Sequence, residues 1–141
     1  MKKENPIPQG KYLPAKRFGN LIYTAGMTPR VQGRLLMTGK VRTHEPLVKY
    51  KKAMEQAANN ALMAARNLLK EGEEIEAVLT MTVYINGEEG YQDHAKLADF
   101  ATDYLYEELG EVAIGTRAAI GVASLPGDAP VEIQLVLGLS L

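Results

Sequence analysis

A permanent cation and a carboxylate stand in the two most strand-like segments of this chain. Within residues 113–137, Arg117 interrupts the first such segment and Glu132 interrupts the second. A guanidinium binds a carboxylate through two parallel hydrogen bonds, and a carboxylate in a low-dielectric pocket can accept a proton from water. The two side chains therefore form either a structural ion pair between neighbouring strands or the polar part of a ligand pocket.

Other chemistries find little support among the remaining residues. There is no cysteine, which excludes disulfides, thiolate metal sites and a cysteine nucleophile. His44 and His94 have no close acidic partner at ligand spacing, so no metal site is expected. Neither Ser124 nor Ser140 lies in a Gly-x-Ser-x-Gly turn, and no glycine-rich phosphate loop occurs. We therefore expect no cofactor.

Length and charge narrow the class of protein further. The 141 residues are enough for one domain, 1–141, with a single core. The formal charge is −1, so no net field points to nucleic acid or to an anionic membrane. The two lysines that follow Met1 lead into no apolar segment, and no apolar run has the length of a membrane span. These features predict a cytoplasmic protein without a membrane partner.

Two segments have the periodicity of helices. Apolar or small residues recur every three to four positions from Leu47 to Leu69, with Pro46 before them and Gly72 after them. A second amphipathic segment runs from about Tyr91 to Leu109 and ends at Gly110. The sequence thus predicts two long helices.

The other ordered segments alternate with a period of two. In residues 131–141 every odd position is apolar, and residues 76–86 alternate in the same way, with Leu79 on the apolar side. Residues 21–26 and, more weakly, 34–40 predict shorter strands. This order of elements predicts an α+β fold in which two helices cover one face of a mixed sheet.

The strand faces opposite the apolar ones are small and mildly polar. A water-exposed sheet face would be expected to carry more lysine and glutamate. We therefore expect this face to pack against other copies of the chain, with polar pockets at the seams; the alternative is a monomer with a solvated face. The residues assigned to this face are Thr80, Thr82, Arg117, Ala119, Gly121, Ala123, Glu132 and Gln134.

Three stretches resemble the RidA (YjgF) family of enamine and imine deaminases. They are YLPAKRFGNLIYTAGMTP from Tyr12, TRAAIGVASLP from Thr116 and VEIQLVL from Val131. Together they span nearly the whole chain in a fixed order. The resemblance implies a chorismate-mutase-like α+β fold assembled as a homotrimeric barrel, with no cofactor and with a small carboxylate-bearing ligand at the trimer interfaces.

The resemblance also implies roles for particular residues. Arg117 matches the arginine that holds the substrate carboxylate, and Glu132 matches the glutamate that positions and activates the attacking water. Tyr12 matches a pocket tyrosine, although it could equally be a packed aromatic at the start of a strand. Ala25 and Gly26 fall in the substrate-binding turn, where Gly26 permits close backbone approach.

Several positions depart from the family pattern. Ala25 and Met27 replace the usual serine and glutamine, Gly115 replaces a proline, and Ala119 replaces a frequent cysteine. The resemblance implies hydrolysis of small imino acids such as 2-aminoacrylate to 2-oxo acids and ammonia. The loss of two polar side chains favours instead a non-catalytic trimer that binds a small carboxylate. Endoribonuclease activity, also credited to the family, is a weaker alternative because the chain has no basic stripe.

Overall fold

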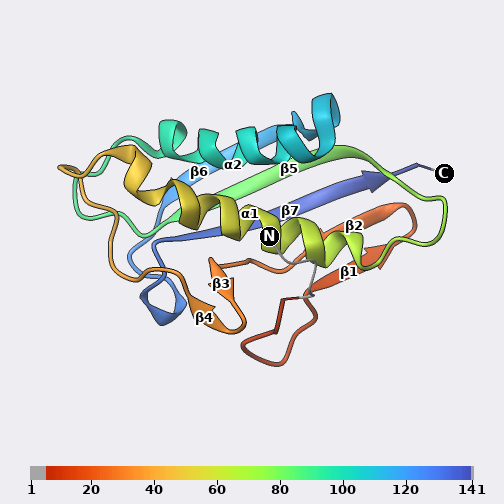
Figure 1. Ribbon diagram of the computed structural model, residues 1–141, viewed down its shortest axis with the longest axis horizontal. Coiled ribbons are helices and arrows are strands. Elements are labelled where there is room, and N and C mark those ends of the chain that lie inside the picture. The colour runs from red at the N-terminus through yellow and green to blue at the C-terminus, as the bar shows by residue number, and fades with distance from the viewer. Residues whose placement is uncertain (1–5, 141) are drawn as a thin grey trace.

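The alternating segments form one mixed sheet whose strand order is β1-β2-β7-β5-β6. The computed structural model describes residues 6–140, so Leu141 of the last predicted strand lies outside the described residues. β5 and β6 run parallel, and every other neighbouring pair is antiparallel (Figure 1). The strands are β1 (Ala15–Phe18), β2 (Leu21–Thr24), β5 (Ile75–Ile85), β6 (Thr116–Gly121) and β7 (Val131–Leu139).

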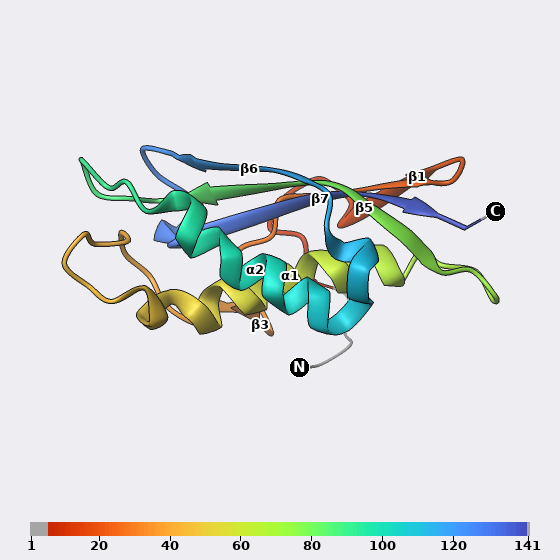
Figure 2. The same cartoon turned by 90° about the horizontal axis from the view of Figure 1, so that it is seen from above.

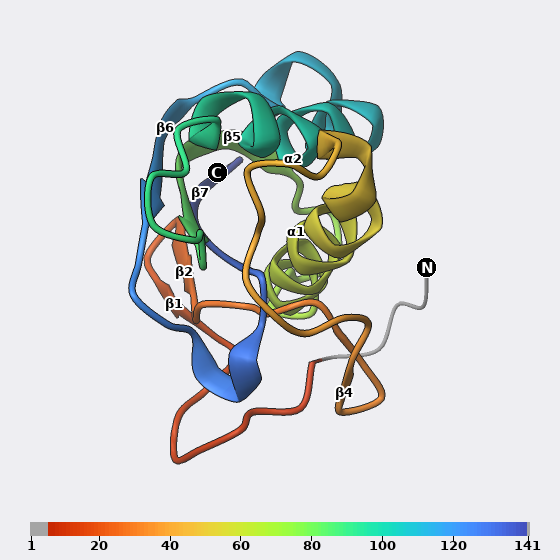
Figure 3. The ribbon, with the colours of Figure 1, turned by 90° about the vertical axis from the view of Figure 1, so that its left-hand side faces the viewer.

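Both helices lie on the same side of this sheet (Figures 2 and 3). A short 3-10 helix, η1 (Leu47–Tyr50), leads into α1 (Lys51–Arg66), and α2 (His94–Leu109) leads into a second one, η2 (Gly110–Ala113). The predicted α+β architecture is therefore confirmed. Within residues 6–140, neither helix has the length and apolar character needed to cross a membrane.

The core lies between the helices and the apolar side of β7. Val131, Ile133, Leu135 and Leu137 are fully buried, and burial of such a side chain contributes about 1.5–3 kcal/mol. The facing side of α1 consists largely of alanine, which lets the helix axis approach the sheet closely. These alanines are Ala53, Ala57, Ala58, Ala61, Ala64 and Ala65.

A bulge in β5 corrects one predicted face. The register against β7 shifts between Val78 and Thr80, so Val78 is buried while Leu79 is 43% exposed. The extra residue reverses the alternation at that point. Leu79 therefore lies on the uncovered side of the sheet, which we call the free face, and not in the core as the alternation predicted.

A two-stranded hairpin stands apart from the main sheet beside α1 (Figure 1). It consists of β3 (Arg30–Val31) and β4 (Arg34–Leu35), so the strand predicted for residues 34–40 is wrong beyond Leu35. The α1 residue Asn60 fixes the hairpin, because its amide donates hydrogen bonds to the carbonyl oxygens of Thr28 (3.0 Å) and Arg30 (2.9 Å).

Candidate functional site

Four of the residues predicted for the site meet in one depression on the free face. Tyr12 comes from the loop before β1, Ala25 and Gly26 follow β2, and Glu132 is the second residue of β7. We call this depression the Glu132 pocket. The loop is tied to the end of β2 by a hydrogen bond from the Ala25 amide to the Pro14 carbonyl (2.8 Å). The lining is completed by Leu13, Lys16, Tyr23 and Thr24.

Glu132 is the partly buried acid of this pocket. Its neighbour on β5 in register is Tyr84, and its carboxylate forms no hydrogen bond or ion pair with any residue in the described range 6–140. Burial raises the pKa of Glu132 above its ordinary value. A carboxylate with a raised pKa and no protein partner is suited to accept a proton from a bound water.

Gly26 allows the Glu132 carboxylate to occupy this place. A Cβ atom on Gly26 would lie 2.8 Å from the carboxyl carbon of Glu132, which is too close for a real contact. The turn is held against β7 by a reciprocal pair of hydrogen bonds, from the Met27 amide to the Ile133 carbonyl (2.7 Å) and from the Ile133 amide to the Met27 carbonyl (2.9 Å). The backbone thus fixes the distance between Gly26 and Glu132.

Tyr12 contributes a hydroxyl at the rim of the pocket. The Tyr12 hydroxyl oxygen accepts a hydrogen bond from the Gln9 amide (3.0 Å), and the side chain is 46% exposed. Because the oxygen serves as the acceptor in that bond, its own proton is available for donation to a ligand or water.

Arg117 does not join this pocket within one chain. In the parallel pairing of β5 and β6 it lies opposite Met81, which is buried under the helices. Its guanidinium donates hydrogen bonds to α2, at Asp99 Oδ1 (2.8 Å) and Thr102 Oγ1 (2.9 Å) from Nη1 and at the Ala95 carbonyl (3.1 Å) from Nη2. Arg117 and Glu132 thus lie on opposite faces of the sheet.

This geometry corrects the predicted faces of β6. Alternation along the sequence predicts that Arg117, Ala119 and Gly121 share the face of Glu132, whereas the register with β5 places all three on the helix-covered side. Small residues at this edge let α2 come close: a Cβ on Gly121 would lie 2.8 Å from His94 Nε2. Ile120, the large apolar residue of β6, is instead 44% exposed on the free face. The strand carries no clear apolar alternation, so its phase could not be inferred from the sequence.

Sequence reasoning missed four residues of the Glu132 pocket, which are Leu13, Lys16, Tyr23 and Thr24. Of these, Lys16 and Tyr23 face each other across β1 and β2, and the sequence did not predict a strand at residues 15–18. The four residues of β1 include two cations and give too short an alternation to indicate a strand. One feature of the sequence could have indicated β1. The segment that begins at Tyr12 runs into the Gly19-Asn20 turn, which leads directly to the strand predicted at residues 21–26.

The comparisons with known proteins agree with this fold. The model of the family described as endoribonuclease L-PSP matches residues 2–137, and the chain belongs to that family, which is the RidA (YjgF) family that the sequence resembles.

Three solved structures are similar to nearly the whole chain. Atu1372 from Agrobacterium tumefaciens, a protein of unknown function, is 27% identical with a TM-score of 0.83, and the match covers 96% of this chain and 87% of that one. A candidate endoribonuclease from Shewanella oneidensis is 23% identical with a TM-score of 0.86, covering 96% and 89%. TdcF from E. coli, solved with bound serine, is 18% identical with a TM-score of 0.67, covering 98% and 95%. The latter two likenesses show the fold.

Proposed function

We propose that this protein hydrolyses small imino acids, of the 2-aminoacrylate type, to 2-oxo acids and ammonia. The observation that carries the proposal is the Glu132 carboxylate, which is partly desolvated and has no partner among residues 6–140. Burying a charge without a partner costs stability. Such an arrangement is typical of a group whose protonation is used in a reaction.

The proposed reaction balances with water as the only co-substrate. The enamine first tautomerises to the imine, and a water held by Glu132 attacks the imine carbon while its proton passes to the carboxylate. The π electron pair of the C=N bond moves to nitrogen, which receives the proton that Glu132 took from the water. The carbinolamine hydroxyl then passes its proton through the Glu132 carboxylate to the nitrogen as the C=O bond forms and the C–N bond breaks, releasing ammonia and the 2-oxo acid. In this scheme Tyr12 donates its hydroxyl proton in a hydrogen bond to the ligand, and the backbone at Ala25 and Gly26 forms the wall.

In this proposal the protein is a homotrimer, and the substrate carboxylate is bound by Arg117 of an adjacent subunit. Within one chain Arg117 lies on the helix-covered side of the edge strand β6, so it cannot reach a ligand held by Glu132 on the free face. The free face also exposes large apolar side chains, as expected of a surface that packs against other copies. These are Phe18, Tyr23, Leu79 and Ile120.

A second candidate function is a trimer that binds a small carboxylate without turnover. Ala25 and Met27 supply no polar side chain where the family has serine and glutamine, which is the feature that favours it. The bound serine in TdcF is a small carboxylate of the required kind and supports either function. The formal charge of −1 gives no support to a ribonuclease, despite the family's description.

Subunit mixing tests both the reaction and the assembly. Arg117→Ala and Glu132→Gln are each expected to abolish 2-oxo acid release from 2-aminoacrylate generated in situ. If each pocket takes Arg117 and Glu132 from different subunits, refolding the two variants together regenerates about a quarter of the wild-type pockets in a closed trimer.

The outcomes separate the alternatives. No recovery on mixing would contradict the shared pocket, and a sedimentation mass of one subunit would contradict the trimer. A wild-type protein no faster than buffer would overturn the deaminase, and carboxylate binding that depends on Arg117 would then identify the non-catalytic trimer.

A further inference from the structure

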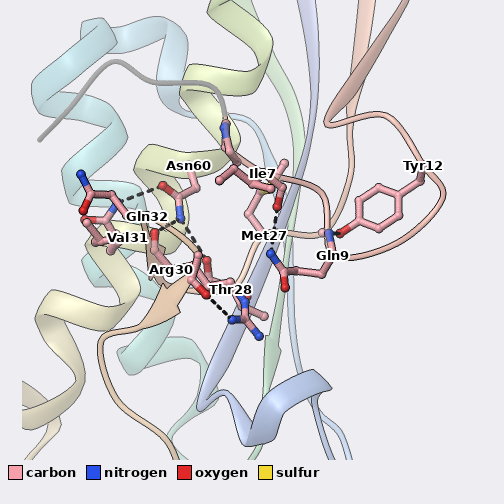
Figure 4. Close-up of a pocket in the computed structure, with 13 residues that line it drawn as sticks. Ile7, Gln9, Tyr12, Met27, Thr28, Arg30, Val31, Gln32 and Asn60 are labelled. Carbon is pink, nitrogen blue, oxygen red and sulfur yellow. Dashed lines mark hydrogen bonds between the residues drawn. The ribbon is translucent and has the colours of Figure 1, made fainter.

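A second cavity lies on the other side of the Gly26 turn, between α1 and the β3–β4 hairpin. Its volume is about 250 Å³, and it shares only Tyr12 and Gly26 with the Glu132 pocket. Figure 4 shows Asn60 and Ile7 on one side of it and Arg30 with Thr28 on another. We call it the Arg30 cavity. Its polar lining consists of Gln9, Thr28, Arg30, Gln32, Gln56 and Asn60.

The positive charge in the Arg30 cavity has no acidic partner in the described lining. Arg30 is the one charged residue in its described lining, which contains no aspartate or glutamate, and Arg30 makes no ion pair with residues 6–140. Its guanidinium donates from Nη1 to the Gly33 carbonyl (2.7 Å), while its buried Nε has no acceptor among these residues. A partly buried cation without a counter-charge favours an anionic ligand.

The wall opposite Arg30 is already ordered. Asn60 holds the hairpin through its two donated hydrogen bonds, and Gln56 Nε2 donates to Asn60 Oδ1 (2.9 Å). Gln56 and Asn60 are one helical turn apart on α1, so both side chains lie on the same face of a rigid element. A ligand entering the cavity meets polar groups whose positions are fixed beforehand, which lowers the entropy cost of binding.

The size and the remaining walls define the ligand class. Ile7, Met27 and Val31 supply an apolar surface beside the polar one. A volume of about 250 Å³ is enough for a metabolite of a few carbon atoms. A small aliphatic carboxylate satisfies both the cation and the apolar wall, whereas inorganic phosphate satisfies only the cation.

We propose that the Arg30 cavity is a binding site for a small aliphatic carboxylate, distinct from the Glu132 pocket and contained in a single subunit. The site does not require that the protein be a deaminase, because none of its charge or geometry depends on Arg117 or Glu132.

The test uses the full chain carrying Arg117→Ala and Glu132→Gln, in which the Glu132 pocket is disabled. Butyrate, the neutral isostere butyramide and inorganic phosphate are titrated by calorimetry. We expect butyrate to bind this double variant, with butyramide and phosphate each at least about tenfold weaker, since a hydrogen bond to a charged group is lost or the apolar wall is left uncovered. Adding Arg30→Gln is expected to weaken butyrate by about tenfold or more, whereas Arg34→Gln, an exposed arginine on β4, is the matched control and leaves it unchanged.

Each remaining outcome overturns part or all of the proposal. The proposed site is contradicted if butyrate does not bind the double variant, or if it binds the double variant with and without Arg30→Gln equally well. Equal binding of phosphate removes the carboxylate assignment. If Arg30→Gln does not fold, the side-chain Nε–Hε resonance of Arg30 in the double variant must shift on adding butyrate; an unshifted resonance also removes the site. Failure of the deaminase assay leaves all of these readouts intact.

Discussion

The charged residues Arg117 and Glu132, on opposite faces of the sheet, differ in whether their own subunit supplies a partner. On the helix-covered side, the Arg117 guanidinium donates to three acceptors on α2, including the Asp99 carboxylate at 2.8 Å. On the free face, Glu132 has a raised pKa and no partner among residues 6–140. A charge satisfied within its own subunit contributes to the fold, whereas an unsatisfied one costs stability unless something outside the subunit meets it. The contrast supports the proposal that the chemistry takes place on the free face.

Loss of the Glu132 charge should have the largest effect. Glu132→Gln preserves the shape of the side chain but cannot take a proton, so kcat/KM for imine hydrolysis should fall by about 10²–10⁴-fold. The measurement is 2-oxo acid release at saturating and limiting substrate. Glu76→Gln, an exposed position on β5, is the control and should behave as wild type; a Glu132→Gln enzyme of normal activity would remove Glu132 from the reaction.

Gly26→Ala should disrupt the same pocket without replacing a charged residue. The new Cβ would lie 2.8 Å from the carboxyl carbon of Glu132 and closer still to Oε2, so the carboxylate must move. A displacement of about 1 Å at a catalytic group costs about a hundredfold in rate. Gly138→Ala is the control, because Gly138 lies on β7 with Glu132. Its new Cβ would meet only the Leu79 side chain, at 3.8 Å, and the substitution should be neutral. Equal effects of the two substitutions would contradict a specific role for Gly26.

The pH dependence of stability sharpens the contrast between unpaired and paired carboxylates. Because the folded-state pKa of Glu132 is raised, the folded protein holds its proton more tightly than the unfolded chain does. Stability from this group is therefore lost as the pH rises from its unfolded pKa through its folded pKa. Glu132→Gln should be more stable than wild type above that interval, and the difference should vanish below it. Urea denaturation at several pH values measures this, and an advantage that grows toward low pH would have the wrong sign.

Glu73 gives the opposite prediction. It accepts hydrogen bonds from both terminal nitrogens of Arg17 at 2.5 Å and from the Lys70 amide at 2.6 Å, and these bonds lower its pKa to about 2. The stability from this pair is present above the unfolded pKa of a glutamate and is lost as the pH falls toward 2. Glu73→Gln should therefore be less stable than wild type at neutral pH, with the difference disappearing in acid. A difference independent of pH would show that the ion pair does not form in solution.

The smallest effect, measured on stability, is expected from the ion pair between Arg117 and Asp99. Asp99 has a side chain that is 62% exposed, and exposed ion pairs contribute about 0.2–1 kcal/mol. A double-mutant cycle with Arg117→Gln and Asp99→Asn, measured by urea denaturation, should give a coupling energy in that range. A coupling energy of zero would mean that Arg117 does not pair with Asp99 in the assembled protein, and the contrast between the two faces would then not hold.

Much of the fold follows from periodicity alone. The 3.6-residue spacing around α1 and α2 and the alternation of β7 fix which sides are apolar, and burial of those sides is the dominant stabilising term. For this reason the two-layer architecture and the placement of Glu132 away from the core were both predicted correctly.

What the sequence determined by itself was therefore the layered α+β fold, the family and the face of Glu132. Only the tertiary structure decided the side of Arg117, because β6 combines small residues with one exposed isoleucine and its phase is set by pairing with β5. It also decided the bulge that turns Leu79 outward, and the meeting of Tyr12, Gly26 and Glu132. Alternation is a local property, whereas register, bulges and pockets depend on contacts between segments far apart in the chain.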